Sequence, residues 1–164
     1  MPVKTARFLP VAALSAAMLS VTSPAMAATT QPVKPASPAK RTIAPCPLSI
    51  HYLLGKKQRR IRAISFLGHV ECPIPVYMDG QAYLYHGKQK EANGRHFSSL
   101  VFAAESHGRY EYGRRRSTYR VKFVVTLTAQ GNARWASLGT HCFRPSPFLV
   151  QTIRCIIYKN IKTK

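Results

Sequence analysis

Six histidines and five carboxylate side chains are the residues of this sequence that could carry acid–base chemistry. His69 and Glu71 lie two positions apart, as do Glu105 and His107, and Arg109 follows two positions later. Residues two apart in a strand share a face, so each pair predicts a histidine beside a carboxylate. Such a pair can move protons, and a nearby arginine can stabilise the charge of a reacting phosphate. A small secreted nuclease could use an acid–base pair of this kind.

The same residues argue against several other chemistries. Five carboxylates leave few ligands for calcium or magnesium and few partners for paired-carboxylate hydrolysis. The histidines show no H-x-H or H-x3-H metal pair, Asp79 is the only aspartate, and no G-x-S-x-G motif occurs. A histidine, a glutamate and an arginine within a few residues are also a common coincidence. We therefore predict a non-enzymatic protein with no cofactor and no metal.

Charge is the most unusual property of the chain. It holds 25 Lys plus Arg residues against 5 Asp plus Glu, a formal net charge of +20. Two clusters of cations follow Gly55 and Gly113, between predicted strands, and smaller groups surround Lys88 and Lys162. Turns with several cations project them into solvent, where they attract polyanions. The predicted binding residues are Lys56, Lys57, Arg59, Arg60, Arg114, Arg115 and Arg116.

The chain contains four cysteines, Cys46, Cys72, Cys142 and Cys155. An even number of cysteines in an exported chain is typical of disulfides. A structural zinc site usually contains a C-x2-C pair, which is missing from this sequence. Four cysteines allow three pairings. We favour Cys46–Cys72 and Cys142–Cys155, because sequential neighbours in a β meander tend to lie close together.

From Cys46 onward, apolar residues recur with a period close to two, which indicates β-strands. The clearest series runs from Tyr119 to Leu127, a second from Ile64 to Cys72, and a third from Leu149 to Ile157. Weaker strands are expected at residues 48–54, 74–78, 82–86, 98–104 and 109–112. The pattern predicts an all-β fold, an antiparallel sandwich or small barrel of about 7–9 short strands.

The dipeptide Asp79-Gly80 stands between two of the short apolar runs. Asp-Gly is a strong signal for a two-residue hairpin, because both residues tolerate positive φ. We therefore expect a turn at Asp79-Gly80 that separates a strand at residues 74–78 from one at residues 82–86.

Residues 1–27 have the layout of a cleavable export signal. Lys4 and Arg7 precede an apolar run over residues 8–21, and Ala25-Met26-Ala27 supplies a small-residue cleavage site. The run is shorter than the about 20 residues of a membrane span, and no later apolar stretch reaches that length. We predict secretion, a disordered Pro/Ala/Lys linker over residues 28–45, and one β domain over residues 46–164.

Several short motifs of this domain resemble a known group of proteins. Gly68-His69-Val70-Glu71-Cys72, Leu84-Tyr85-His86-Gly87 and Gly108-Arg109-Tyr110 are similar to segments of small exported bacterial β-rich proteins with two disulfides. That group has no assigned function. The resemblance covers most of residues 46–155, implies export and a sandwich-like fold, and carries over no catalytic residue.

The sequence favours an exported, strongly basic binding module whose loops engage an anionic polymer or surface. Cell-wall polymers, nucleic acids and anionic lipid headgroups all fit such a field. Two alternatives stay open: a small secreted nuclease or toxin-like enzyme, and an inhibitor or structural partner of another exported protein. If the protein is an inhibitor or structural partner, the charged loops serve solubility alone.

Overall fold

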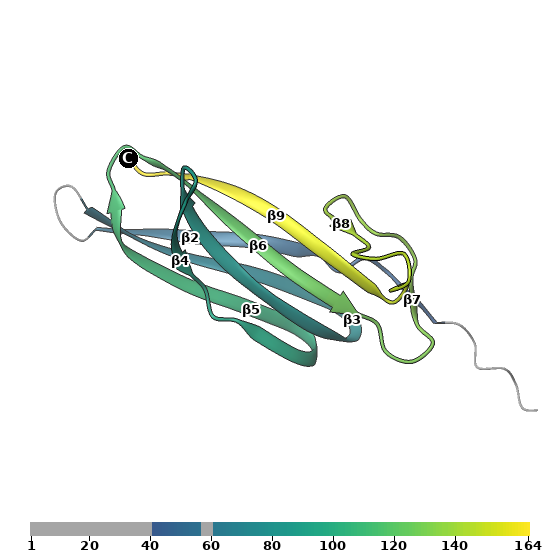
Figure 1. Cartoon of the computed structure of the whole chain (residues 1–164). Helices are drawn as coiled ribbons and strands as arrows, with labels where there is room; N and C mark the ends of the chain where they lie inside the picture. The colour runs from purple at the N-terminus through teal and green to yellow at the C-terminus, as the bar shows by residue number, and fades with distance from the viewer. Residues whose placement is uncertain (1–40, 57–60) are drawn as a thin grey trace, which may run out of the picture. The chain divides into compact units, whose positions relative to one another are not determined.

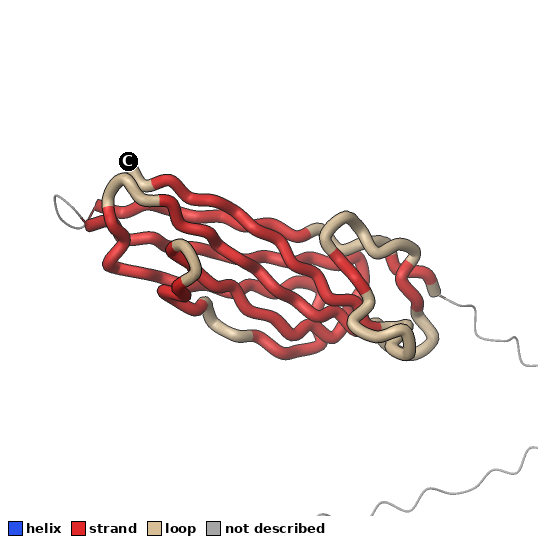
Figure 2. Tube along the Cα trace, turned by 45° about the horizontal axis from the view of Figure 1, so that its top comes forward, coloured by secondary structure: helices blue, strands red, loops and turns tan. Residues whose placement is uncertain are grey.

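The computed structural model describes residues 41–56 and 61–164 of the chain. Within these ranges every regular element is a strand, and no helix occurs. The strands are β1 (Thr42–Ile43), β2 (Leu48–Lys56), β3 (Ile61–His86), β4 (Gln89–Asn93), β5 (Phe97–Arg114), β6 (Thr118–Thr128), β7 (Arg134–Trp135), β8 (Cys142–Phe143) and β9 (Thr152–Lys162). The long strands form one curled antiparallel sheet, a half-barrel (Figures 1 and 2). The predicted all-β fold is confirmed.

The sheet is organised by β3, which has 26 residues and pairs with four other strands. Residues 61–71 lie between β2 and β5, whereas residues 76–86 lie between β6 on one edge and β5 and β4 on the other. The β5 ladder is irregular between Glu71 and Val76. Pro73 and Pro75 stand there, and a proline has no N–H to donate to the ladder. The break marks the place where β3 changes partner from β2 to β6.

The remaining strands extend the sheet beyond β6. β9 pairs with β6 over the whole length of β6, from Thr118↔Lys162 to Thr128↔Thr152, and the short β8 lies on the other edge of β9. β1 and β7 form a separate parallel pair. β1 lies inside the segment predicted as a linker, and its Ile43 is buried.

The core fills the inner face of the curled sheet and follows the predicted alternation. The inward residues of β6 are all buried: Tyr119, Val121, Phe123, Val125 and Leu127. Those of β3 and β9 are buried too: Ile64, Phe66, Val70, Cys72, Ile153 and Cys155. Because successive side chains of a strand point to opposite faces, the period-two series in the sequence correctly predicts this face.

The predicted turn at Asp79-Gly80 is wrong. Both residues lie within β3, where Gly80 pairs with Phe97 of β5 and Val125 of β6. A Cβ on Gly80 would lie 2.8 Å from the Phe97 ring and 2.8 Å from the Val124 carbonyl oxygen, so the glycine allows close packing between strands. The turn lies further on, at Gly87, which has a φ of 60° and joins β3 to β4.

Other strand boundaries also differ from the prediction. Residues 74–78 and 82–86 belong to the single strand β3, and residues 98–104 and 109–112 belong to the single strand β5. β9 begins at Thr152, and Leu149 is half exposed outside it. The long strands β3 and β5 contain glycines and polar residues that are typical of turns. For this reason the sequence pattern divides each of them into two shorter strands.

Two disulfides join Cys46 to Cys72 and Cys142 to Cys155, and no described cysteine is free. The favoured pairing is therefore confirmed. Both bonds lie at the same end of the sheet, since Cys72 stands in the irregular part of β3 and Cys155 near the start of β9. Two disulfides are consistent with an extracellular location.

Candidate polyanion-binding end

Strand register brings Lys56, the one described residue of the first predicted cluster, to the same end of the sheet as the second cluster. Lys56, the last residue of β2, pairs with Arg62, and Ile61, the first residue of β3, pairs with Arg114 at the end of β5. Thr118 at the start of β6 pairs with Lys162 of β9. We call the end formed by these residues and the β3–β4 turn the basic end; it carries the C-terminus (Figure 1).

The β5–β6 turn at the basic end is held by two buried side chains. The Thr163 hydroxyl donates a hydrogen bond of 2.6 Å to the Arg114 carbonyl and accepts one of 2.9 Å from the Ser117 N–H. The Tyr119 hydroxyl accepts a hydrogen bond of 2.7 Å from the Arg114 N–H. Since Thr163 and Tyr119 are nearly inaccessible to solvent, these bonds fix the backbone that presents the arginines.

The turn itself carries three consecutive exposed arginines, Arg114, Arg115 and Arg116. Arg116 has a φ of 56°, the only positive φ of a non-glycine residue among those described. A left-handed backbone is unfavourable for such a residue, so the surrounding bonds must maintain it. The three side chains are exposed, and no carboxylate of the described residues forms an ion pair with them.

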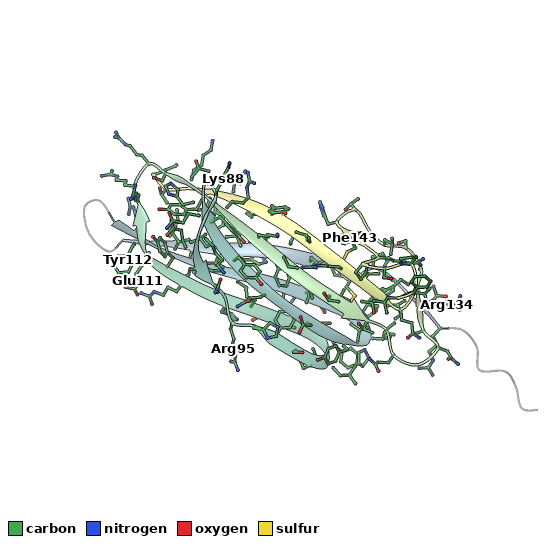
Figure 3. The ribbon with its side chains drawn as sticks, viewed as in Figure 1. Lys88, Arg95, Glu111, Tyr112, Arg134 and Phe143 are labelled. Atoms are coloured by element: carbon green, nitrogen blue, oxygen red, sulfur yellow. A yellow bond between two sulfur atoms is a disulfide. The ribbon has the colours of Figure 1, made fainter. Side chains whose placement is uncertain are left out.

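The predicted site residues divide into two groups. Arg114, Arg115 and Arg116 lie at the basic end, and Lys56 ends β2 there. Lys57, Arg59 and Arg60 lie outside the described residues. The smaller cationic groups join the same end through the β3–β4 turn with Lys88 and through the C-terminal Lys162 and Lys164 (Figure 3 labels Lys88).

Two cations at this end were missed by sequence reasoning. Arg62 donates a hydrogen bond of 3.3 Å from its guanidinium to the Lys164 carbonyl. Arg120 lies on the outer face of β6, 3.3 Å from the Asn160 side-chain oxygen of β9. Arg62 stands two residues after Arg60 and continues the first basic cluster, whereas Arg120 belongs to no run of cations. The only sequence signal for Arg120 is its position between two inward-facing residues, which places its side chain on the outer face.

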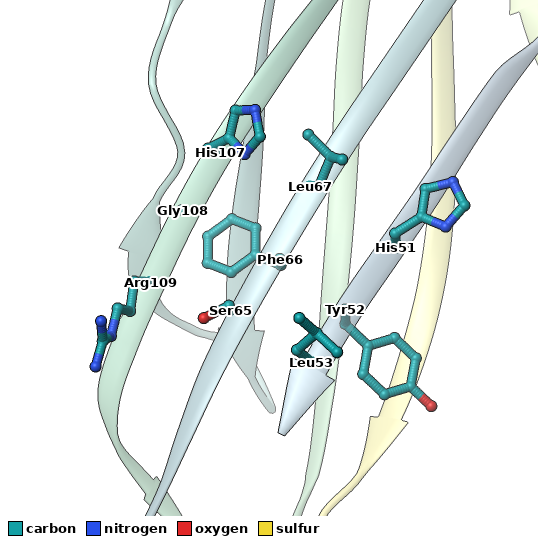
Figure 4. A pocket seen from close by; sticks show the side chains of 9 residues that line it. All are labelled: His51, Tyr52, Leu53, Ser65, Phe66, Leu67, His107, Gly108 and Arg109. Carbon is teal, nitrogen blue, oxygen red and sulfur yellow. The ribbon is translucent and has the colours of Figure 1, made fainter. Parts of the chain in front are cut away.

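A second group of polar residues lies at mid-sheet, on the outer faces of β2, β3 and β5. Cross-strand pairing forms three rows there, which we call the histidine face: Ser49–His69–Glu105, His51–Leu67–His107 and Leu53–Ser65–Arg109. A shallow pocket of about 680 Å³ opens on it, with Leu67 between His51 and His107 (Figure 4).

Glu105 connects two of the histidines on this face. His107 Nε2 lies 2.7 Å from Glu105 Oε2 and donates a hydrogen bond to it, and His69 Nδ1 lies 3.3 Å from Oε1. The His107 hydrogen bond is the main reason why the Glu105 pKa lies below its ordinary value. The His69 Nδ1 atom is buried and has no hydrogen-bond partner. The structure thus places the predicted Glu105, His107 and Arg109 on one face.

Metal-binding and membrane-crossing elements are not found in the described part of the chain. Residues 41–56 and 61–164 contain no group of three or more His, Cys, Asp or Glu side chains placed to share a metal ion. Nor do they contain a helix long and apolar enough to cross a membrane.

Comparisons with known proteins add little to this description. The sequence matches no protein-family model and no curated protein. Among solved structures, the chain is similar to a protein from Archaeoglobus fulgidus, with 11% sequence identity over 71% of this chain and 96% of that chain and a TM-score of 0.30. A similarity at this level carries no argument about fold or function.

Proposed function

We propose that this protein is exported and that its basic end binds polyanions without catalysing a reaction. The observation that carries the proposal is the pairing of Ile61 with Arg114 and of Thr118 with Lys162, which gathers separate cationic segments of the sequence at one end. A cluster of exposed cations raises the local concentration of anionic groups. Export is supported by the signal-like N-terminus and the two disulfides.

The recognised chemistry is a series of closely spaced anionic groups, such as the phosphates of a polymer. Contacts from arginine and lysine to such groups release condensed counterions, so the affinity should fall steeply with salt. These contacts carry no information about base sequence. Binding should therefore depend on charge density and length, and hardly on the identity of the monomer.

The test uses inorganic polyphosphate as the probe and a variant that neutralises the rigid turn. Its changes are Arg114→Gln, Arg115→Gln and Arg116→Asn, because asparagine tolerates the left-handed backbone at position 116. We expect weaker binding and a salt dependence whose logarithmic slope falls by about 2, at roughly 0.7 per lost contact.

The matched control removes the same number of charges from the opposite end of the sheet. Its changes are Arg134→Gln, Arg144→Gln and Arg154→Gln, all at exposed positions. This control should bind polyphosphate almost as the parent protein does. Equal binding by parent, variant and control would overturn the proposal. The charge would then serve solubility, and the inhibitor or structural-partner hypothesis would take precedence.

A second candidate function, cleavage of RNA, is favoured by the arrangement of the histidine face. His51 and His107 both neighbour Leu67 across the sheet, one on each side, and Arg109 follows His107 on the same face. RNA carries its own nucleophile, the 2′-hydroxyl, so a base, an acid and a cation suffice. We infer this function only as an alternative to binding alone.

The reaction would be an in-line transphosphorylation. Neutral His51, whose Nε2 lies 3.0 Å from the Ser49 hydroxyl, would remove the 2′-hydroxyl proton as the 2′-oxygen bonds to phosphorus. Protonated His107, oriented by Glu105, would give its proton to the 5′-oxygen as the bond from phosphorus to that oxygen breaks. Arg109 would stabilise the extra negative charge, and a 2′,3′-cyclic phosphate would result.

An oligodeoxynucleotide with a single ribonucleotide tests this candidate. Cleavage should occur at the ribonucleotide alone, fall at least about 100-fold with His107→Gln, and persist with His141→Gln, an exposed histidine outside the histidine face. If the pure parent protein cleaves nothing between about pH 5 and 8, the candidate is wrong and the binding proposal is unaffected.

A further inference from the structure

The loop closed by the Cys142–Cys155 disulfide exposes an unusual run of apolar side chains. Phe148 is 91% exposed, Leu149 50% and Val150 41%. We call these three consecutive residues the apolar tip. Phe143, in the same loop, is 46% exposed (labelled in Figure 3). Soluble proteins rarely leave several consecutive large apolar residues in water unless the surface serves an interaction.

The tip is a fixed structure, because hydrogen bonds hold it on both sides. The Phe148 and Leu149 N–H groups donate to the side-chain and main-chain oxygens of Ser146, at 3.3 and 3.2 Å. The Thr152 N–H then donates to the Leu149 carbonyl at 3.0 Å, which closes a turn. A preorganised loop already exposes its apolar side chains in the bound conformation. It therefore loses little conformational entropy when it binds.

Gln151, the residue after the tip, ties the loop to the neighbouring segment. Its carbonyl accepts a hydrogen bond of 2.8 Å from the Trp135 indole and one of 2.9 Å from the Ala129 N–H. Its side-chain amide also donates to the Gly131 carbonyl. The tip is therefore supported by the segment between β6 and β7 as well as by the disulfide.

Exposed cations accompany the tip and have no acidic neighbours in sequence. Arg144 lies four residues before Phe148, Arg154 pairs with Phe143 across β8 and β9, and Arg134 adjoins Trp135. No Asp or Glu follows Glu111 in the chain. The ion pairs of the described residues do not include any of these arginines.

We propose that the apolar tip inserts into the headgroup region of an anionic lipid bilayer, with the surrounding arginines on the lipid headgroups. A projecting loop tip suits insertion into a deformable interface, where phenylalanine and leucine can leave water while nearby backbone stays hydrated. Arginines beside the tip add attraction to an anionic leaflet. This site lies at the end of the sheet opposite to the basic end, so it stands independently of the proposed function.

Vesicles of phosphatidylglycerol mixed with phosphatidylcholine provide the test, with vesicles of phosphatidylcholine alone for comparison. The parent protein should sediment with the anionic vesicles and much less with the neutral ones. Phe148→Ser with Leu149→Ser should lower the partition coefficient at least about tenfold, since two large apolar side chains no longer leave water. Phe102→Ser, at a strand position that is 57% exposed, is the matched control and should bind like the parent.

Insertion and simple adsorption are distinguished by a Phe148→Trp variant. Its tryptophan fluorescence should shift to shorter wavelength on vesicle binding and be quenched by lipids brominated near the headgroup. Trp135 is buried, and the parent protein corrects for its contribution. Two results would overturn the proposal: vesicle binding unchanged by the double serine variant, or no spectral shift and no quenching. Capture of a protein partner by the tip, without vesicle binding, would also overturn it.

The arginine variants separate this proposal from the polyanion proposal. The Arg134, Arg144 and Arg154 triple variant should lose affinity for anionic vesicles and keep its affinity for polyphosphate. The Arg114, Arg115 and Arg116 triple variant should lose affinity for polyphosphate and keep the insertion of the tip into anionic vesicles, measured by the Phe148→Trp shift. Loss of both activities in the same variant would mean that one surface serves both ligands, and the assignment of the tip would be wrong.

Discussion

At the basic end, the β6–β9 ladder and the pairs of β3 with β2 and β5 continue to the last residues of the strands, and buried side chains complete the turn. At the opposite end the β6–β9 ladder also reaches the ends of both strands, but the long chain between β6 and β9 contains only the two short strands β7 and β8. Both disulfides lie at this opposite end, which we call the disulfide end. The comparison teaches that hydrogen bonds suffice where long strands pair to their ends. Disulfides reinforce the end with short strands and long connections, and one of them joins the paired residues Cys142 and Cys155 of β8 and β9.

The largest difference between the ends should appear when the disulfides are removed. Each pair of Cys→Ala changes should lower the free energy of unfolding by about 2–4 kcal/mol, because the unfolded chain gains freedom. The Cys46–Cys72 bond closes a loop twice as long as the Cys142–Cys155 bond, 26 against 13 residues, so it should contribute about 0.6 kcal/mol more. Denaturant unfolding measures both values.

Polyphosphate binding at a temperature where both cysteine variants stay folded checks whether the ends are independent. The affinity should match that of the parent, because the basic end is held by its own hydrogen bonds. A weaker affinity in a fully folded variant would show that the disulfides also position the arginines, and the comparison would fail.

The stability and the binding of the basic end should depend most on the Thr163 hydroxyl. Thr163→Val keeps the shape of the side chain and removes the hydrogen bonds of the hydroxyl to Arg114 and Ser117 in the β5–β6 turn. Because the Ser117 N–H and the Arg114 carbonyl then lose a buried partner, unfolding should become easier by about 1–3 kcal/mol. Polyphosphate affinity should fall as well.

Thr128→Val is the control for this change, since its hydroxyl pairs with that of Thr152 at 3.2 Å near the disulfide end. It should cost less stability and leave polyphosphate affinity unchanged. If both valine variants lose equal affinity, a general loss of stability explains the effect, and Thr163 has no special role in the turn.

A smaller effect of opposite sign is expected at Arg116. Arg116→Gly relieves the left-handed backbone of a residue with a Cβ, worth about 1–2 kcal/mol, and adds about 0.5–1 kcal/mol of chain entropy to the unfolded state. The folded state should gain roughly 0.5 kcal/mol from these opposing effects. Polyphosphate affinity should fall because a cation is lost.

Arg115→Gly removes the same charge from a residue of ordinary φ, so it should lose both affinity and stability. Thermal unfolding and polyphosphate titration of the two variants show whether the backbone at Arg116 is kept for binding. A loss of stability in Arg116→Gly would mean that the arginine side chain makes a contact worth more than the strain.

The inner face and the disulfides could be predicted from the sequence, because the inner face follows from alternation along each strand and the disulfides join successive cysteines. The alternation from Tyr119 to Leu127 survives in β6 residue by residue, and pairs of successive cysteines proved to be the bonded ones. The turn at Asp79-Gly80 failed because the residues that permit a turn also permit close packing in a strand. The close neighbours that distinguish these two uses of Gly80, among them the Phe97 ring and the Val124 carbonyl oxygen, belong to other strands.

The candidate site was predicted by composition, but its assembly was not. Arg114, Arg115 and Arg116 were recognised as an exposed basic turn, and they form one. Their position next to the start of β3 follows from the pairing of Ile61 with Arg114, residues far apart in sequence. A single sequence contains no signal for that register. Arg62, in contrast, stands two residues after Arg60, so the sequence cluster alone contains the signal for it.

The histidine face lies between the two ends and should give the smallest effect. The Glu105 pKa is lowered in the folded chain, first by the His107 hydrogen bond and further by the charges of His107 and His69. A carboxyl whose folded pKa is depressed adds stability that is fully present above its unfolded pKa, near 4.5, and is lost as the pH falls through the lower folded pKa. The stability of Glu105→Gln should therefore fall below that of the parent above pH 4.5 and converge with it in more acidic solution.

Glu71→Gln is the control for this change. The Glu71 carboxylate lies 3.9 Å from His69, and this variant should follow the parent more closely. Parallel curves for parent and Glu105→Gln down to about pH 2 would show that the ionisation of Glu105 contributes nothing to folding. The exposure of Glu105 keeps the effect small, because solvent screens its charge, and neither polyphosphate nor vesicle binding should change with it.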